Sequence, residues 1–279
     1  MAVVLITGCS SGFGLLTALH FVRKGDTVYA SMRNTSKAAP LDEAREKEKL
    51  ALHVVQLDVT EEESVRKAVQ QVLGDAGRID VLVNNAGISA HGPIEETDDD
   101  ETKEIFETNF FGALRVMRAV APKMREQRSG TIVNVSSLAG VVTAPFVGTY
   151  SASKRALEAA SEALYFELHP FGVRVLLIEP GGFETNIQDT RRVARRFTEG
   201  SPYLDFERRF QQALTRLPAA GTLGDPQVVA ETIYNAVYDQ QPKLRYLVGQ
   251  DAEQIGGLRR QMDDEQFEQT MRQALDFWE

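Results

Sequence analysis

The stretch "TGCSSGFG" at residues 7–14 follows the apolar run "AVVLI" at residues 2–6 and precedes the helix-like stretch "LLTALHFV". Its three glycines, Gly8, Gly12 and Gly14, have the spacing G-x-x-x-G-x-G. A buried strand, a glycine-rich turn and a helix in this order are typical of a unit that binds a dinucleotide. Gly8 would allow a tight exit from the strand, Gly12 a close approach of the backbone to a pyrophosphate, and Gly14 close packing of helix on sheet.

The phosphates of such a ligand would meet the free N–H groups and the partial positive charge at the start of the following helix. Ser10 and Ser11 add hydroxyl donors to the same turn. The alternative is a plain turn that only joins a strand to a helix. The rest of the sequence has to decide between these two interpretations.

Short apolar runs alternate with amphipathic stretches along most of the chain. Runs that are almost continuously apolar and β-branched are typical of strands buried on both faces. We expect strands at residues 2–6, 27–32, 52–59, 79–87, 130–137, 173–182 and 244–249. We expect helices at residues 13–23, 61–76, 99–126 and 151–169. This alternation predicts right-handed βαβ units and a doubly wound parallel sheet between two layers of helices, the Rossmann fold.

The length of 279 residues suits one large α/β domain, and we interpret residues 1–279 as a single domain. Residues 183–224 depart from the alternating pattern, because they are rich in charge and interrupted by glycine and proline. They follow a strand and precede a late helix. We therefore expect this segment to form a small lid over the substrate.

Composition excludes several classes of function. A formal net charge of −9 argues against binding to nucleic acid or to an anionic membrane surface. No apolar run approaches the roughly 18 residues of a membrane span. Cys9 is the only cysteine, here expected to be a small filler, and the four histidines are scattered, so no disulfide and no metal site are predicted. A cytoplasmic protein is the expectation.

The end of the second predicted strand indicates which nicotinamide cofactor would bind. Enzymes that use NAD usually have an acidic residue at this place, which hydrogen-bonds the ribose. The stretch "VYASMRNTSK" has no acid between Val28 and Lys37, but it has Arg33. A carboxylate beside a 2′-phosphate would cost of the order of a few kcal/mol, and an arginine would gain a comparable amount. NADP(H) is predicted and NAD(H) is less favoured; the alternative is that Arg33 only caps a loop.

The stretch "YSASK" at residues 150–154 places Tyr150 and Lys154 four residues apart, on one face of a helix. A phenol with a pKa near 10 is a poor base at neutral pH. A nearby ammonium and the positive nicotinamide ring would lower the pKa of Tyr150 into the range of general acid–base catalysis. Ser137 ends a predicted strand at the same edge of the sheet as Gly8, and its hydroxyl could hydrogen-bond a substrate oxygen.

Together these motifs resemble the short-chain dehydrogenase/reductase family, in its short single-domain branch. The resemblance covers about residues 2–186, where the motifs follow the family's order and spacing. They are "TGCSSGFG" (7–14), "LDV" (57–59), "NNAG" (84–87), Asn109, Ser137, "YSASK" (150–154) and "PGGFET" (180–185). Phe13 stands where the family more often has Ile. The C-terminal part, with "PKLRYLVGQDA" (242–252), resembles hydroxysteroid and retinol dehydrogenase-like members more loosely.

The resemblance implies a role for each matching position. Asn109, Ser137, Tyr150 and Lys154 would form the catalytic tetrad, with a water of the proton relay near Asn109. The remaining positions would hold the cofactor: Asp58 and Val59 at the adenine, Asn85, Ala86 and Gly87 along its length, and Pro180, Gly181, Phe183 and Thr185 at the nicotinamide, with Tyr150 and Lys154 also in contact. The resemblance also implies a homodimer or homotetramer formed through the helices at 99–126 and 151–169.

The stretch between Ser137 and Tyr150 carries no charge and predicts an apolar substrate pocket. Its walls would be Leu138, Val141, Phe146, Phe183 and Ile187, with Ser137 and Tyr150 at the reacting oxygen. We expect hydride transfer between the nicotinamide and a bulky apolar ketone or secondary alcohol, with Tyr150 as general acid or base. The alternative is a catalytically silent dinucleotide-binding sensor or scaffold protein, which would not need the Tyr150–Lys154 pair.

Two further features, one in the lid and one near the predicted pocket, each allow two interpretations. Arg191, Arg192, Arg195 and Arg196 lie in a helix-like stretch and are expected to form a solvated lid face paired with nearby acids; the alternative is a contact to an anion. His91 could reach the mouth of the pocket, or it could be a solvated loop histidine.

Overall fold

The computed structural model describes residues 1–185, 187, 190–216 and 223–276. Its centre is a seven-stranded sheet in which every neighbouring pair of strands is parallel, in the order β3-β2-β1-β4-β6-β7-β9. The strands are β1 (Val3–Ile6), β2 (Thr27–Met32), β3 (Leu52–Gln56), β4 (Val81–Asn84), β6 (Gly130–Val135), β7 (Val173–Pro180) and β9 (Arg245–Val248). The predicted Rossmann fold is confirmed.

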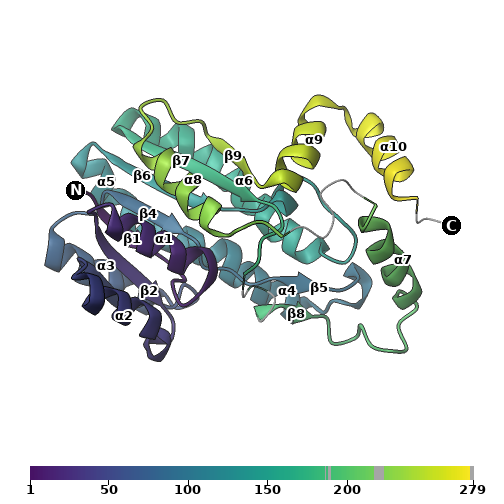
Figure 1. Cartoon of the computed structure of the whole chain (residues 1–279), viewed down its shortest axis with the longest axis horizontal. Coiled ribbons are helices and arrows are strands. Elements are labelled where there is room, and N and C mark those ends of the chain that lie inside the picture. The colour runs from purple at the N-terminus through teal and green to yellow at the C-terminus, as the bar shows by residue number, and fades with distance from the viewer. Residues whose placement is uncertain (186, 188–189, 217–222, 277–279) are drawn as a thin grey trace.

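The helices cover both faces of this sheet and extend beyond one end of it. They are α1 (Gly12–Arg23), α2 (Ala39–Glu48), α3 (Glu62–Ala76), α4 (Asp99–Phe106), α5 (Ala113–Gln127), α6 (Gly148–Leu168), α7 (Leu204–Leu214), α8 (Gln227–Tyr238), α9 (Gly257–Gln261) and α10 (Asp264–Leu275). Figure 1 shows the N-terminus beside β1 at the left, and α7, α9 and α10 gathered at the opposite side with the C-terminus.

Two apolar cores lie on the two faces of the sheet because successive side chains of a strand point to opposite faces. Val4 and Ile6 of β1 pack with residues of α1, α2 and α8. Leu5 of the same strand packs with residues of α3, α5 and α6 on the other face. All three side chains are fully buried, as expected for a strand covered on both sides.

The predicted strands all form, but five of them end earlier than expected, including β3 at Gln56 and β9 at Val248. β4, β6 and β7 end at Asn84, Val135 and Pro180, so that the residues just after them are free to form turns at the edge of the sheet. Helix α2 was not predicted, since Leu41 is its only buried residue and the segment therefore has no apolar stripe.

The helix expected at 99–126 is divided into three parts. α4 is followed by a π-helical segment, Glu107–Gly112, and then by α5. The predicted start is confirmed: acids occupy the first turn, and the backbone N–H of Asp98 donates to the Glu101 carboxylate at 3.0 Å. The π-helical segment contains Asn109, one of the predicted catalytic residues.

A third, smaller core lies at the carboxyl ends of the strands, under the region predicted as a lid. A two-stranded parallel ribbon joins β5 (Ala90–His91) to β8 (Arg192–Val193). The core consists of buried Phe146, Phe210, Ala213 and Leu275. We call the region that packs around this third core the cap. Leu275 belongs to α10, so the cap includes a helix from beyond the predicted lid at 183–224. Of that predicted lid, residues 186, 188–189 and 217–222 lie outside the described residues.

In the described part of the chain, no helix combines the length and the apolar composition that crossing a membrane requires.

Candidate active site

The site lies where the strand order reverses, at the carboxyl ends of β1 and β4. The Thr7 hydroxyl accepts hydrogen bonds from the backbone N–H groups of Asn85 and Ala86, both at 3.0 Å. In return the Asn85 amide donates to the carbonyl oxygens of Thr7 at 2.9 Å and Gly8 at 3.1 Å. These bonds join the glycine turn to the "NNAG" stretch. Thr7 was not predicted, because its partners lie in a distant part of the sequence.

The glycine turn has backbone angles and contacts that other residues would disturb. Gly8 and Gly12 have φ angles of +74° and +56°, in the left-handed region that favours glycine. A Cβ on Gly14 would lie 2.3 Å from the Gly8 carbonyl oxygen. Helix α1 therefore starts directly against the end of β1, as predicted.

The start of α1 fits an anionic ligand. Ser11 is its N-cap residue and makes no capping hydrogen bond through its side chain, and the first turn carries no acid. Within the described residues, the first N–H groups of this helix therefore lack a carboxylate or hydroxyl partner of their own. Ser10 and Ser11 are both half-buried. This donor set suits the pyrophosphate of a dinucleotide.

The "PGGFET" stretch lies across the glycine turn. The rings of Phe13 and Phe183 meet edge to face, with centroids 5.5 Å apart. A Cβ on Gly12 would lie 3.5 Å from the Cβ of Thr185. The backbone N–H of Gly182 donates to the Asp251 carboxylate at 2.7 Å. Asp251 was not predicted, because no local motif marks it.

Cys9, which follows β1, and Gly181, which follows β7, have further contacts. The Cys9 thiol is buried and contacts the carbonyl oxygen of Ile6 at 3.3 Å, and burial raises its pKa. A buried, protonated thiol is consistent with the expected small filler. Gly181, which follows Pro180 at the end of β7, donates its N–H to the carbonyl oxygen of Val248 at 2.9 Å.

At the other end of the crevice, Arg33 follows β2 and Asp58 follows β3. The Arg33 side chain is largely exposed, and its Nε lies 3.9 Å from an Asp58 carboxylate oxygen. The other Asp58 oxygen accepts from the N–H and hydroxyl of Thr60 at 3.0 and 2.8 Å. Val59 is buried. The structure thus brings the predicted phosphate-binding arginine beside Asp58, one of the two residues predicted at the adenine.

The first turns of α6 bring Tyr150 and Lys154 together, next to Ser137. The Lys154 ammonium lies 5.8 Å from the centre of the Tyr150 ring and donates to the carbonyl oxygen of Val135 at 2.8 Å. The Ser137 hydroxyl accepts from the N–H of Ala139 at 3.1 Å, which starts a short 3₁₀ turn at Leu138–Gly140. Lys154 is only 4% exposed, so this cation is almost fully removed from water.

Burial dominates the electrostatics of this pair. It lowers the pKa of Lys154 to about 8, against a smaller opposing effect of Glu158. It also raises the pKa of Tyr150, and the hydrogen bond with Ser137 opposes this. The sequence predicted a lowered pKa for Tyr150; in the chain by itself the direction is opposite, because loss of water around the phenol outweighs the stabilising neighbours.

Asn109 is fixed in the π-helical segment, close to Lys154. Its side-chain oxygen accepts from the N–H of Ile88 at 2.8 Å, and its amide donates to the Ile88 carbonyl at 2.9 Å. The amide also donates to the Ser153 hydroxyl at 3.1 Å, and that hydroxyl donates to the Tyr150 carbonyl at 2.7 Å. A Cβ on Gly87 would lie 3.2 Å from Asn109 Oδ1 and 3.6 Å from Lys154 Nζ. π-Helical bulges are frequent at functional sites.

Comparison with known protein families shows to which family the chain belongs. The family model described as short chain dehydrogenase matches residues 2–196. The chain belongs to the short-chain dehydrogenase family. The resemblance seen in its motifs is therefore confirmed, and with it the class of oxidoreductases.

Two curated relatives of this dehydrogenase are similar over most of their length. The 3-ketodihydrosphingosine reductase of Bacteroides thetaiotaomicron is 38% identical over 247 residues, covering 88% of this chain and 87% of that protein. Retinol dehydrogenase 8 of Homo sapiens is 38% identical over 251 residues, covering 87% of this chain and 79% of that protein.

Solved structures of the family have the same fold. A short-chain dehydrogenase from Streptomyces avermitilis is 35% identical, with a TM-score of 0.81 and 98% of both chains covered. Gluconate 5-dehydrogenase from Burkholderia cenocepacia, in complex with NADP and tartrate, is 26% identical, with a TM-score of 0.71 over 84% of this chain and 87% of that one. A Burkholderia phymatum family member in complex with NAD is 25% identical, with a TM-score of 0.78 over 96% and 95%.

The residues predicted to wall the substrate pocket of the dehydrogenase lie in different surroundings. Leu138 and Val141 are half-buried in and beside the turn after β6, and Ile187 is half-buried in the cap region. Phe183 is buried against Phe13. Phe146 is also buried, and its ring lies 5.8 Å from Phe197, 5.6 Å from Phe206 and 6.2 Å from Phe210. The structure thus places Phe146 in the core of the cap.

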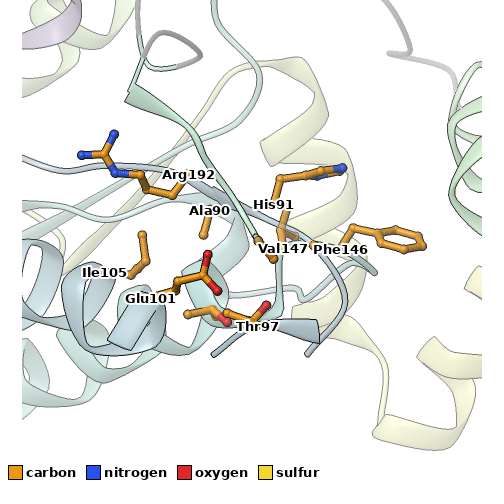
Figure 2. A pocket seen from close by; sticks show the side chains of 11 residues that line it. Ala90, His91, Thr97, Glu101, Ile105, Phe146, Val147 and Arg192 are labelled. Atoms are coloured by element: carbon orange, nitrogen blue, oxygen red, sulfur yellow. The ribbon is translucent and has the colours of Figure 1, made fainter. Parts of the chain in front are cut away.

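A small cavity of about 10 Å³ lies beside this cluster, between α4 and the ribbon of β5 and β8. It is large enough for about one water molecule and too small for a substrate. Figure 2 shows the rings of His91 and Phe146 pointing away from the Glu101 carboxylate. His91 is buried and pairs with Glu207 of α7 at 3.0 Å. It is therefore not a solvated loop residue, and it connects β5 to the cap.

Three of the four lid arginines, Arg192, Arg195 and Arg196, pair with acids as expected, but they do not lie in a helix. Arg192 belongs to β8 and forms an ion pair with Glu104 at 2.9 Å. Arg195 lies 3.7 Å from Glu101, and Arg196 lies 3.5 Å from Asp98. These pairs join the extended lid segment to α4 in place of the predicted helix-like piece.

Proposed function

We propose that this dehydrogenase transfers hydride between NADP(H) and a bulky apolar ketone or secondary alcohol, with Tyr150 as the general acid or base. The observation that carries the proposal is the pair of half-buried Tyr150 and buried Lys154 beside Ser137 and Asn109, at the strand ends where the glycine turn lies. A protein that only senses or holds a dinucleotide does not need a buried lysine under a tyrosine. Among the described residues, we find no contact in the site that favours this alternative.

The residues of this chain would each perform one part of the reaction. A bound reduced nicotinamide supplies the hydride. The Ser137 hydroxyl hydrogen-bonds the carbonyl oxygen and aligns it with the Tyr150 hydroxyl, which donates its proton as the oxygen gains charge. Lys154 stabilises the phenolate that remains. Asn109 fixes the Ile88 backbone and Ser153 close to this proton path.

Cofactor selection would depend on Arg33 and Asp58, while the glycine turn, "NNAG" and Pro180–Thr185 would hold the rest of the dinucleotide. Solved relatives bind NADP in one case and NAD in another, so family membership leaves the choice open. The exposed guanidinium of Arg33 is free to turn from its 3.9 Å contact with Asp58 toward a phosphate.

Replacing Arg33 with Ala is expected to raise KM for NADPH by about 10-fold to 100-fold, since a charge-assisted hydrogen bond contributes about 1.5–3 kcal/mol. KM for NADH should change little. Steady-state kinetics with both cofactors measure this. Arg45→Ala removes an arginine that pairs with Asp42 on α2 and serves as control. A wild-type preference for NADH would contradict the assignment of NADP.

The substrate class follows from the uncharged segment after Ser137 and from the apolar cap. The two curated relatives are named for 3-ketodihydrosphingosine and for retinol, compounds with large apolar parts. The substrate class can be tested by screening steroid, aromatic and aliphatic ketones and alcohols, with turnover measured from the absorbance of NADPH. Turnover of small charged metabolites only would contradict it.

The pH dependence of reduction is expected to follow Lys154. This lysine is protonated below its pKa of about 8 and loses its proton as the pH rises through that value. The pKa of Tyr150 is raised, so its hydroxyl stays protonated in the same range. We expect kcat/KM for NADPH to fall about tenfold per pH unit above a pH of about 8. Lys154→Arg should move this decline to higher pH; an unmoved decline would assign it to another group.

We also propose that the protein forms a homodimer or homotetramer. Phe111 in the π-helical segment is 46% exposed and Phe166 on α6 is 71% exposed. Contact with a second copy of the chain would remove the apolar surface of both rings from water. The single-domain organisation, the cytoplasmic location and the absence of nucleic acid and membrane partners stay predictions.

A further inference from the structure

A group of charged side chains lies behind the candidate active site, between α6, β7, β9 and α9. Arg245 of β9 forms ion pairs with Glu158 at 2.8 Å and with Glu179 at 3.1 Å. Arg260 of α9 pairs with the other Glu179 oxygen at 2.6 Å. The Glu158 side chain is 7% exposed and that of Glu179 is fully buried. Buried carboxylates are costly unless they are paired, so this arrangement requires both arginines.

Glu158 lies one helical turn after Lys154, on the same face of α6. It also touches the segment that carries Ser137: a Cβ on Gly140 would lie 3.2 Å from Glu158 Cγ and 2.8 Å from the Ser136 hydroxyl. Lys154 itself donates to Val135 at the start of that segment. Glu158 therefore contacts the back of the serine segment on one side and Arg245 on the other.

Glu179 lies directly before "PGGFET", the segment predicted to contact the nicotinamide, as Glu158 lies against the segment that carries Ser137. It is the residue before Pro180 at the end of β7. Arg245 is thus the side chain that links the end of β7 to α6. The third partner of Arg245 is Glu162, at 3.1 Å. Its side chain is 53% exposed, and it lies one helical turn beyond Glu158, farther from Lys154.

We propose that Glu158, held by Arg245, is a positioning residue for the reaction: it fixes Lys154 against the segment that carries Ser137. This rests on the proposed function, because it acts through residues of that site. Glu158 touches neither substrate nor cofactor in this scheme. Its negative charge also favours the protonated form of the buried lysine.

The charged and titratable neighbours of these groups agree with this role. Lys154 is accompanied on α6 by Tyr150 and Glu158. Glu158 faces Arg245 from β9 and Glu179 from β7, with Glu162 beyond it on its own helix. Burial lowers the pKa of Lys154, and the charge of Glu158 opposes that effect.

The test compares Glu158→Gln with Glu162→Gln, since both remove one carboxylate partner of Arg245 from the same helix. We expect kcat for ketone reduction to fall about tenfold in Glu158→Gln, with its alkaline decline moved to lower pH and NADPH affinity unchanged. Glu162→Gln should stay within about twofold of wild type. Equal kinetics in the two variants would overturn the proposal.

A second measurement does not depend on turnover. NMR of the Lys154 ε-carbon follows the titration of this lysine, and the Lys154→Arg variant assigns its signal. The midpoint should be roughly half a pH unit lower in Glu158→Gln than in wild type. Glu162→Gln should leave it in place. An unmoved midpoint in Glu158→Gln overturns the role of its charge. If the wild type reduces no ketone, the proposed function fails while this titration still decides on Glu158.

If Glu158→Gln does not fold, as circular dichroism would show, Glu158→Asp takes its place. It keeps the charge but withdraws the carboxylate by one methylene from the segment that carries Ser137. A lowered kcat at unchanged NADPH affinity supports the positioning role, and wild-type kcat overturns it.

Discussion

Replacing Tyr150 with Phe is expected to lower kcat for ketone reduction by about a thousandfold, the loss typical of a missing general acid. The ring keeps its place in the first turn of α6, so only the proton donor is removed. Lys154 and Ser137 remain, but neither can replace the phenol: the ammonium donates to the Val135 carbonyl and the serine side chain caps its own turn. Stopped-flow measurement of hydride transfer under single-turnover conditions would measure the loss in the chemical step itself.

The control for this prediction is cofactor binding. NADPH affinity, measured by fluorescence, should change by less than about twofold, because the hydroxyl contributes to the reaction and not to the glycine turn. Tyr165→Phe removes a phenolic hydroxyl farther along the same helix and should keep wild-type turnover. If Tyr150→Phe also keeps it, the proposed acid is wrong. A wild-type chain that binds NADPH but converts no substrate would favour the sensor or scaffold alternative.

Replacing Gly14 with Ala is expected to destabilise the fold by about 3 kcal/mol and to abolish measurable NADPH binding. The added Cβ would lie 2.3 Å from the Gly8 carbonyl oxygen and 2.5 Å from the Asn85 amide nitrogen. Gly8 cannot easily move away, because it packs closely on the next segment: a Cβ added to Gly8 would lie 2.8 Å from the Cα of Ala86. Helix α1 would have to move away from β1, and its N–H groups with it. Urea unfolding and fluorescence titration measure the two effects.

The matched control is Gly74→Ala in α3. Gly74 is exposed, and nothing lies within 4 Å of the Cβ that alanine would add. Alanine in a helix interior is favoured over glycine, so this variant should gain about 0.5–1 kcal/mol of stability. Wild-type NADPH binding by Gly14→Ala would show that close packing of α1 on β1 is not required for the site.

Most of the sheet was predictable, because strands buried on both faces have a strong and local sequence signal. β2 forms at the predicted residues, β1 starts one residue later than predicted, and β9 is one residue shorter at each end. Prediction failed where local signals compete or are missing. α2 carries charge around a single buried leucine, Leu41, and the segment Glu107–Gly112 widens into a π-helix around Asn109.

The predicted site residues belong to short motifs, and the structure brings these motifs to one edge of the sheet. The residues that hold the motifs together were not predicted. Thr7 bonds to the segment after β4, Asp251 to Gly182, and Arg245 to Glu158. Each of these contacts joins distant parts of the chain, so no spacing in the sequence indicates it. The position of Phe146 in the core of the cap depends in the same way on α7 and α10.

The sequence by itself determined the strand–turn–helix unit at residues 7–14 and the pairing of Tyr150 with Lys154, because both follow from local backbone geometry. Only the tertiary structure decided the electrostatics. Burial raises the pKa of Tyr150 and lowers that of Lys154, and a buried carboxylate behind the lysine is held by an arginine from the edge strand. Solvent exposure and neighbouring charges depend on every segment that packs around a residue, and spacing along the chain does not record them.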